Sequence, residues 1–72
     1  MPRKSEPTLA NDVRELRAQI GMTQQQLADQ VGVTRQTIVA LEGEAYTPSL
    51  ALALRIAKAF SKPVEKIFWF NK

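Results

Sequence analysis

The sequence predicts a compact all-α domain of five short helices, and three observations support this fold class. Two helix-start signals lie close together at Thr23 and Thr34, with Gly32 between them. Apolar residues recur at helical spacing on both sides of this pair. The chain has 72 residues, enough for one small domain with one hydrophobic core. We expect a flexible arm over residues 1–8, the helical domain over residues 9–68 and an aromatic tail over residues 69–72.

The central pair of helices is predicted from its end signals. Thr23 and Gln26 fit a capping box, in which each side chain accepts a hydrogen bond from a backbone N–H at the start of the helix. Gly32 supplies the left-handed backbone conformation for a tight exit, and Thr34 is the N-cap of the next helix. The two helices are expected over residues 24–31 and 35–42. Two short helices joined by a turn of about three or four residues form a helix-turn-helix.

The segment before this pair is predicted to form an amphipathic helix over about residues 11–20, which ends at Gly21. Its apolar face consists of Val13, Leu16 and Ile20. Arg17 lies close to that apolar face, so its charge needs a partner in the folded protein.

Two further helices are expected after the central pair. Ser49 is the N-cap of a helix over residues 50–60, and Pro63 limits the continuation of that helix. Its expected core stripe consists of Leu50, Ala53, Leu54, Ala57 and Phe60, while Leu52 and Ile56 are apolar residues off the centre of that stripe. Residues 64–68 are expected to form a last short turn of helix.

The composition excludes several classes of protein. The chain has neither cysteine nor histidine, which argues against a disulfide, a metal site and most enzymatic chemistry, and no cofactor is expected. Oligomerisation is the remaining way to stabilise so small a domain. No apolar run is long enough for a membrane span or a signal peptide, so we expect a cytoplasmic protein. Ten basic and seven acidic residues are compatible with a polyanionic partner.

The outward face of the predicted helix over residues 35–42 carries the functional signal. Ile38 and Leu41 are expected to face the core, which leaves Arg35, Gln36, Thr37 and Ala40 on the opposite side. In a helix that lies in the major groove, glutamine suits adenine and arginine suits guanine. The alternative is that these residues are ordinary solvent-facing positions.

The segments from Gly21 to Glu42 and from Tyr46 to Leu50 resemble the phage-repressor/Cro (XRE) family of helix-turn-helix DNA-binding domains. The resemblance covers about residues 11–68 and rests on Thr-Gln, Leu-Ala, Val-Gly-Val-Thr-Arg-Gln-Thr-Ile and Leu-Glu in this order. It implies a lambda-repressor-like fold and small stand-alone regulators as the most similar proteins.

The resemblance also implies a role for individual residues. The positions that match base contacts are Arg35, Gln36, Thr37 and Ala40. Those that we assign to phosphate contacts are Thr23, Gln24, Thr34 and Tyr46. Arg17 and Glu42 match a partly buried ion pair between the first and third helices, which gives Arg17 its partner.

The sequence departs from the family pattern directly after Glu42. The family commonly has a variable residue, a glycine and a basic residue, whereas this chain has Gly43, Glu44 and Ala45. Either the left-handed cap is shifted by one residue, or Glu44 adopts it under strain. The missing cation and the added carboxylate weaken any phosphate contact from this loop.

The sequence therefore predicts a DNA-binding transcriptional regulator, a repressor that binds double-stranded DNA with two-fold symmetry as a homodimer. The expected dimer interface consists of Leu52, Ile56, Trp69 and Phe70. The alternatives are an antitoxin-type protein, whose aromatic C-terminus binds a protein partner, and an adaptor that keeps the fold without binding DNA.

Overall fold

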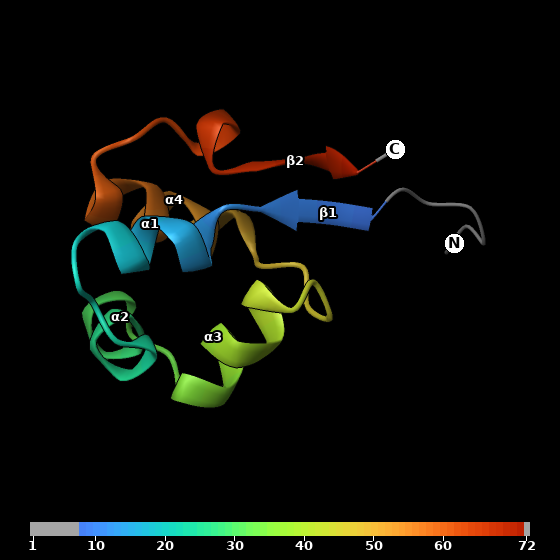
Figure 1. The fold of residues 1–72 in the computed structure, drawn as a ribbon. Coiled ribbons are helices and arrows are strands. Elements are labelled where there is room, and N and C mark those ends of the chain that lie inside the picture. Colours follow the sequence, from blue (N-terminus) through green and yellow to red (C-terminus); the bar gives the residue numbers. More distant parts are fainter. Residues whose placement is uncertain (1–7, 72) are drawn as a thin grey trace.

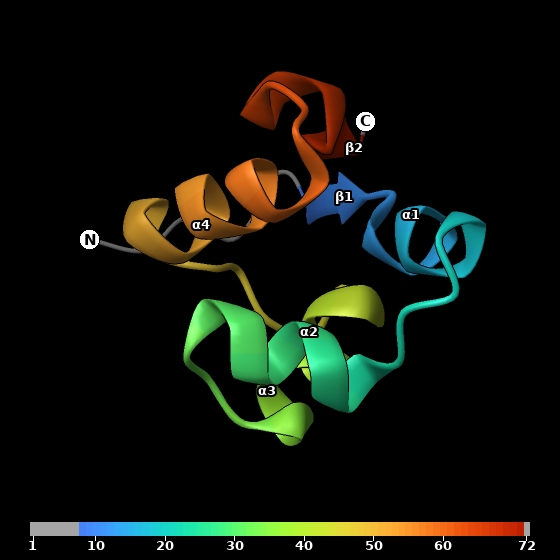
Figure 2. The same ribbon diagram turned by 90° about the vertical axis from the view of Figure 1, so that its left-hand side faces the viewer.

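The computed structural model describes residues 8–71, with seven elements in chain order (Figure 1). They are β1 (Thr8–Asn11), α1 (Val13–Gln19), α2 (Gln24–Val31), α3 (Arg35–Glu42), α4 (Leu50–Phe60), the 3₁₀ turn η1 (Val64–Lys66) and β2 (Phe68–Asn71). In Figures 1 and 2, α2 and α3 form one end of the molecule, and the sheet and η1 lie at the other end. Within the described range, every helix is too short or too polar to cross a membrane.

The two-stranded sheet corrects the predicted all-helical fold. β1 and β2 pair antiparallel, with Leu9 opposite Phe70 and Ala10 opposite Trp69. The arm predicted over residues 1–8 falls outside the described residues except for Thr8, which belongs to β1. The predicted fifth helix is only the turn η1, and the aromatic residues that follow it form a strand. Aromatic side chains favour extended backbone, and pairing with β1 satisfies the backbone hydrogen bonds of this segment.

The helix ends follow the local sequence signals. Thr23 accepts a hydrogen bond from the Gln26 backbone N–H at 3.0 Å, and the Gln26 side chain accepts one from the Thr23 N–H at 2.8 Å. Gly32 has the left-handed φ of 78° that the turn requires. Thr34 caps α3 and Ser49 caps α4, as predicted. Val33, between the helices, is partly buried against the core.

The pattern of buried residues shows that the predicted orientation of α4 and the predicted burial of Ile20 were wrong. Leu52 and Ile56 are buried, whereas Leu50 is 72% exposed and Leu54 is exposed as well. Both faces of α4 carry large apolar side chains and share Ala53 and Ala57, so the helix sequence fits two orientations. Packing against α2 and η1 selects the face with Leu52 and Ile56. These two residues are therefore unavailable as dimer-interface residues. Ile20, which follows the last residue of α1, is exposed instead of buried.

The loop after α3 has a strained backbone at Glu44, which is one of the two alternatives that the sequence allowed. Glu44 has a φ of 62°, whereas Gly43 has a φ of −83°. The N–H of Ala45 donates to the Ala40 carbonyl at 2.9 Å, which closes the end of α3 in the manner of a Schellman motif. Glu44 thus occupies the position that favours glycine, at a cost of about 1–2 kcal/mol.

We expect Glu44→Gly to stabilise the protein. Glycine removes the strain but loses more conformational entropy on folding, so the net gain is about 0.5–1 kcal/mol. The midpoint of urea unfolding measures the gain. Glu44→Ala is the control, because it removes the same charge and keeps the strain. Equal stability of the two variants would contradict a role for backbone strain at this position.

Candidate nucleic-acid interface

The outward face of α3 presents a row of side chains at one end of the molecule. Arg35 and Gln36 are exposed, and one turn further along Val39 is 42% exposed and Ala40 partly exposed. On the opposite side of α3, its core-facing residues Ile38 and Leu41 are buried. The helix therefore offers long polar side chains in its first turn and small apolar side chains in its second.

The first turn of α3 uses two of the predicted contact residues for its own cap. The Thr34 hydroxyl accepts from the Thr37 backbone N–H at 3.2 Å, and the two threonine hydroxyl oxygens are 3.1 Å apart. Thr37 is partly buried, while Thr34 is exposed. Arg35 and Gln36 lie between them with no side-chain hydrogen bond inside the described part of the chain. These two side chains are thus free to reach a ligand.

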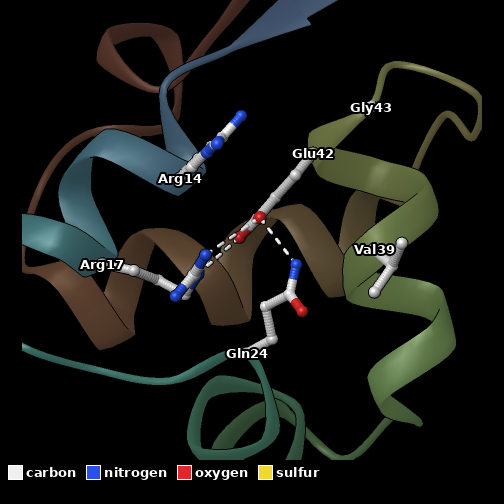
Figure 3. A pocket seen from close by; sticks show the side chains of 6 residues that line it. All are labelled: Arg14, Arg17, Gln24, Val39, Glu42 and Gly43. Atoms are coloured by element: carbon white, nitrogen blue, oxygen red, sulfur yellow. Dashed lines mark hydrogen bonds and ion pairs between the residues drawn. The ribbon is translucent and has the colours of Figure 1, made fainter.

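A network of hydrogen bonds joins α1, α2 and α3 behind this face (Figure 3). The Glu42 carboxylate accepts from Arg17 Nε at 2.5 Å, from Arg17 Nη2 at 3.1 Å and from Gln24 Nε2 at 3.1 Å. The Glu42 side chain is only 5% exposed and that of Arg17 is 14% exposed. The ion pair that the resemblance implied is therefore present, and Gln24 is a third member.

Arg17 also bonds the turn that leads into α2. Its Nη1 donates to the Met22 carbonyl at 2.8 Å. The hydrogen bonds to Glu42, and to a smaller extent its negative charge, raise the pKa of Arg17 above its ordinary value. The hydrogen bonds to Glu42 thus favour the charged form of the guanidinium group. One side chain links the start of α2 to the end of α3, which fixes the two helices relative to each other.

The residues assigned to phosphate contacts lie in different surroundings. Thr23 is exposed but is used in the capping box, and Gln24 is partly buried because its amide bonds Glu42. Only one of the two amide hydrogens of Gln24 is needed for that bond. Tyr46 is exposed in the loop beyond α3. The structure thus brings Gln24 next to α3, and the DNA contacts of all four residues stay predictions.

Sequence reasoning missed three residues that shape this interface. Asn11 Nδ2 donates to the Leu41 carbonyl at 2.9 Å and its Oδ1 accepts from the Val13 N–H, so it bonds both α1 and α3. Arg55 Nη1 donates to the Val31 carbonyl at 2.9 Å and holds the end of α2 from α4. Val39 could have been found from helical spacing, since it lies three residues after Gln36.

The comparisons with known proteins agree with this geometry. A sequence model described as helix-turn-helix matches residues 13–67. An uncharacterized HTH-type transcriptional regulator of Bacillus subtilis, YgzD, is 52% identical over 64 residues, 89% of this chain and 97% of the relative. An uncharacterized HTH-type transcriptional regulator of Methanothermobacter thermautotrophicus is 56% identical over 57 residues, 78% of this chain and 83% of the relative.

Solved structures give the same result. The restriction-modification controller protein C.AhdI of Aeromonas hydrophila has a TM-score of 0.69 and 30% identity over 75% of this chain and 78% of its own. A Bacteroides fragilis protein has a TM-score of 0.76 over 85% of this chain and 98% of its own, and its identity of 21% supports the fold alone. The family match over most of the chain and relatives more than half identical show that this chain belongs to the phage-repressor/Cro (XRE) type of the helix-turn-helix family.

Proposed function

We propose that this protein is a transcriptional regulator that binds a specific sequence in double-stranded DNA as a homodimer and represses by occupying a promoter. One observation carries the proposal. The outward face of α3 exposes Arg35 and Gln36, and hydrogen bonds to Glu42 join this helix to α1 and α2. A helix that is held by its neighbours and has free polar side chains in its first turn suits the reading of bases in the major groove.

The proposed mechanism divides the contacts into two groups. Phosphate contacts from Thr23, Gln24, Thr34 and Tyr46 fix the position of the protein on the duplex without reading its sequence. Arg35 and Gln36 read base edges, Thr37 supports them from the cap of α3, and Ala40 offers only a methyl group for contact with thymine.

The proposed homodimer uses the exposed aromatic residues of β2. Phe70 is 67% exposed and Trp69 is also exposed. Because successive residues of a strand point to opposite faces, the two rings offer apolar surface on both faces of β2 for contact with another chain. A two-fold dimer uses the same surface on both subunits. Its two α3 helices would enter successive major grooves about 34 Å apart.

Selection of bound duplexes from a random-sequence library tests this function. We expect an enriched sequence with two inverted half-sites whose centres are about 10 base pairs apart. Affinity for this duplex should fall steeply with salt concentration, because binding displaces counterions from the phosphates. Sedimentation should give the mass of two chains on one duplex. Failure to enrich any sequence, or binding that does not depend on salt, would reject the proposal.

A second candidate function is favoured by the same exposed aromatic pair. An antitoxin-type protein would bind a different protein through Trp69 and Phe70 and bind DNA with α3. Sedimentation of the pure protein separates the two uses of this surface, because a homodimer through β2 needs no second protein. The second candidate would be favoured if the pure protein is a stable monomer and Trp69 becomes buried only when the product of a neighbouring gene is added. The intrinsic fluorescence of Trp69 reports this change.

A further inference from the structure

A hollow of about 350 Å³ lies between α1, the start of α2 and α3. Figure 3 shows the six residues that line it, namely Arg14, Arg17, Gln24, Val39, Glu42 and Gly43. We infer that this hollow takes a phosphate group of the DNA backbone and that Arg14 makes the charged contact with it. The inference rests on the proposed DNA binding and adds a residue to it.

The charges around the hollow favour an anion. Arg17 neutralises the Glu42 carboxylate through two hydrogen bonds, so this pair has no net charge. The side chain of Arg14 projects from α1 on the side that faces α3 (Figure 3). It is exposed and forms no ion pair with any residue of the described chain. The hollow therefore has one uncompensated positive charge. An arginine can hold a phosphate with two parallel hydrogen bonds.

Neutral donors lie on the same side of the molecule. Gln24 Nε2 uses one hydrogen for Glu42 and keeps a second for a ligand. Gln24 is also the first residue of α2, where backbone N–H groups have no partner inside the helix. An anion in the hollow would receive a hydrogen bond from the Gln24 side chain in addition to the charge of Arg14.

The position of the hollow relative to α3 identifies the source of the phosphate. Val39 belongs both to the outward face of α3 and to the wall of the hollow. Because the two share Val39, DNA that contacts the outward face of α3 would bring the phosphates of one strand next to the hollow. The loop over residues 43–49 contains Glu44 and no cation, so it cannot supply the charge. Arg14 supplies it from α1 instead.

The salt dependence of DNA binding tests this inference. The probe is a mixed-sequence duplex long enough for two half-sites, since a phosphate contact does not depend on base sequence. We expect Arg14→Ala to weaken binding and to reduce the slope of log affinity against log salt by about 0.9 for each bound protomer. Arg14→Lys should restore most of the slope, because it keeps the charge. Arg14 is exposed, so the melting temperature should stay unchanged.

Lys58→Ala is the matched control. Lys58 is an exposed cation of α4, away from the hollow, and its loss changes the net charge by the same amount. A slope that changes for Arg14→Ala and not for Lys58→Ala supports the phosphate contact. Equal slopes for Arg14→Ala and the unaltered protein overturn it and leave the proposed function intact. An unaltered protein that binds no DNA rejects both.

Discussion

Glu42→Gln is expected to cause the largest loss of stability of any single change considered for this chain. The substitution leaves the guanidinium of Arg17 without its counter-charge at a position where the side chain is 14% exposed. Breaking such a pair costs about 3–5 kcal/mol when one charge stays buried alone. Because Arg17 keeps some contact with water, we expect the low end of this range. The melting temperature should then fall by more than about 10 °C, since each kcal/mol corresponds to about 4–8 °C in a domain of this size.

Two further variants define the cause of this loss. Glu15→Gln removes the same charge from an exposed position of α1 and should leave the melting temperature nearly unchanged. Arg17→Met combined with Glu42→Met removes both charges and should recover part of the stability. The recovery is partial because the Met22 carbonyl and Gln24 lose a hydrogen-bond partner. Equal melting temperatures of Glu42→Gln and Glu15→Gln would show that the ion pair does not stabilise the folded protein.

Gln36→Ala is expected to have the largest effect on recognition. Its side chain is exposed in the first turn of α3 and has no hydrogen bond to the described part of the chain. Loss of a bidentate contact with a base costs about 1–3 kcal/mol, which is about 5- to 150-fold in affinity. We expect this loss on the selected duplex and little change on mixed-sequence DNA. Titration of both duplexes at one salt concentration measures the difference.

Gln30→Ala is the matched control for this variant. It removes the same side chain from an exposed position on α2, on the side where Arg55 and Lys58 lie. Its affinity for both duplexes should equal that of the unaltered protein. If Gln36→Ala weakens binding to both duplexes equally, Gln36 contacts the backbone and does not read the sequence.

The loop after α3 shows how a local signal can leave a choice open. Gly43 and Glu44 were both candidates for the left-handed position, and the structure assigns it to Glu44. The backbone hydrogen bond from Ala45 to Ala40 sets the length of the cap and so decides which residue adopts the positive φ. Local sequence favoured glycine there, and the hydrogen bonding of the helix end overrode this preference.

The sequence by itself predicted the helices over residues 24–31, 35–42 and 50–60, their N-caps Thr23, Thr34 and Ser49, and the turn at Gly32. The cap and turn signals act between residues a few positions apart, because the backbone geometry at a helix end admits few types of side chain. The ion pair came from the family resemblance, which already contains the packing of related chains.

Only the tertiary structure decided the remaining features. β1 and β2 come from opposite ends of the chain, so neither segment carries a signal for its partner. The orientation of α4 depended on which of two apolar faces met α2, and this choice corrected the predicted roles of Leu52 and Ile56. The position of Arg14 beside the hollow required α1 and α3 to be placed together. Each of these features depends on contacts between distant segments, whose free energy is a property of the packed molecule and not of any local stretch.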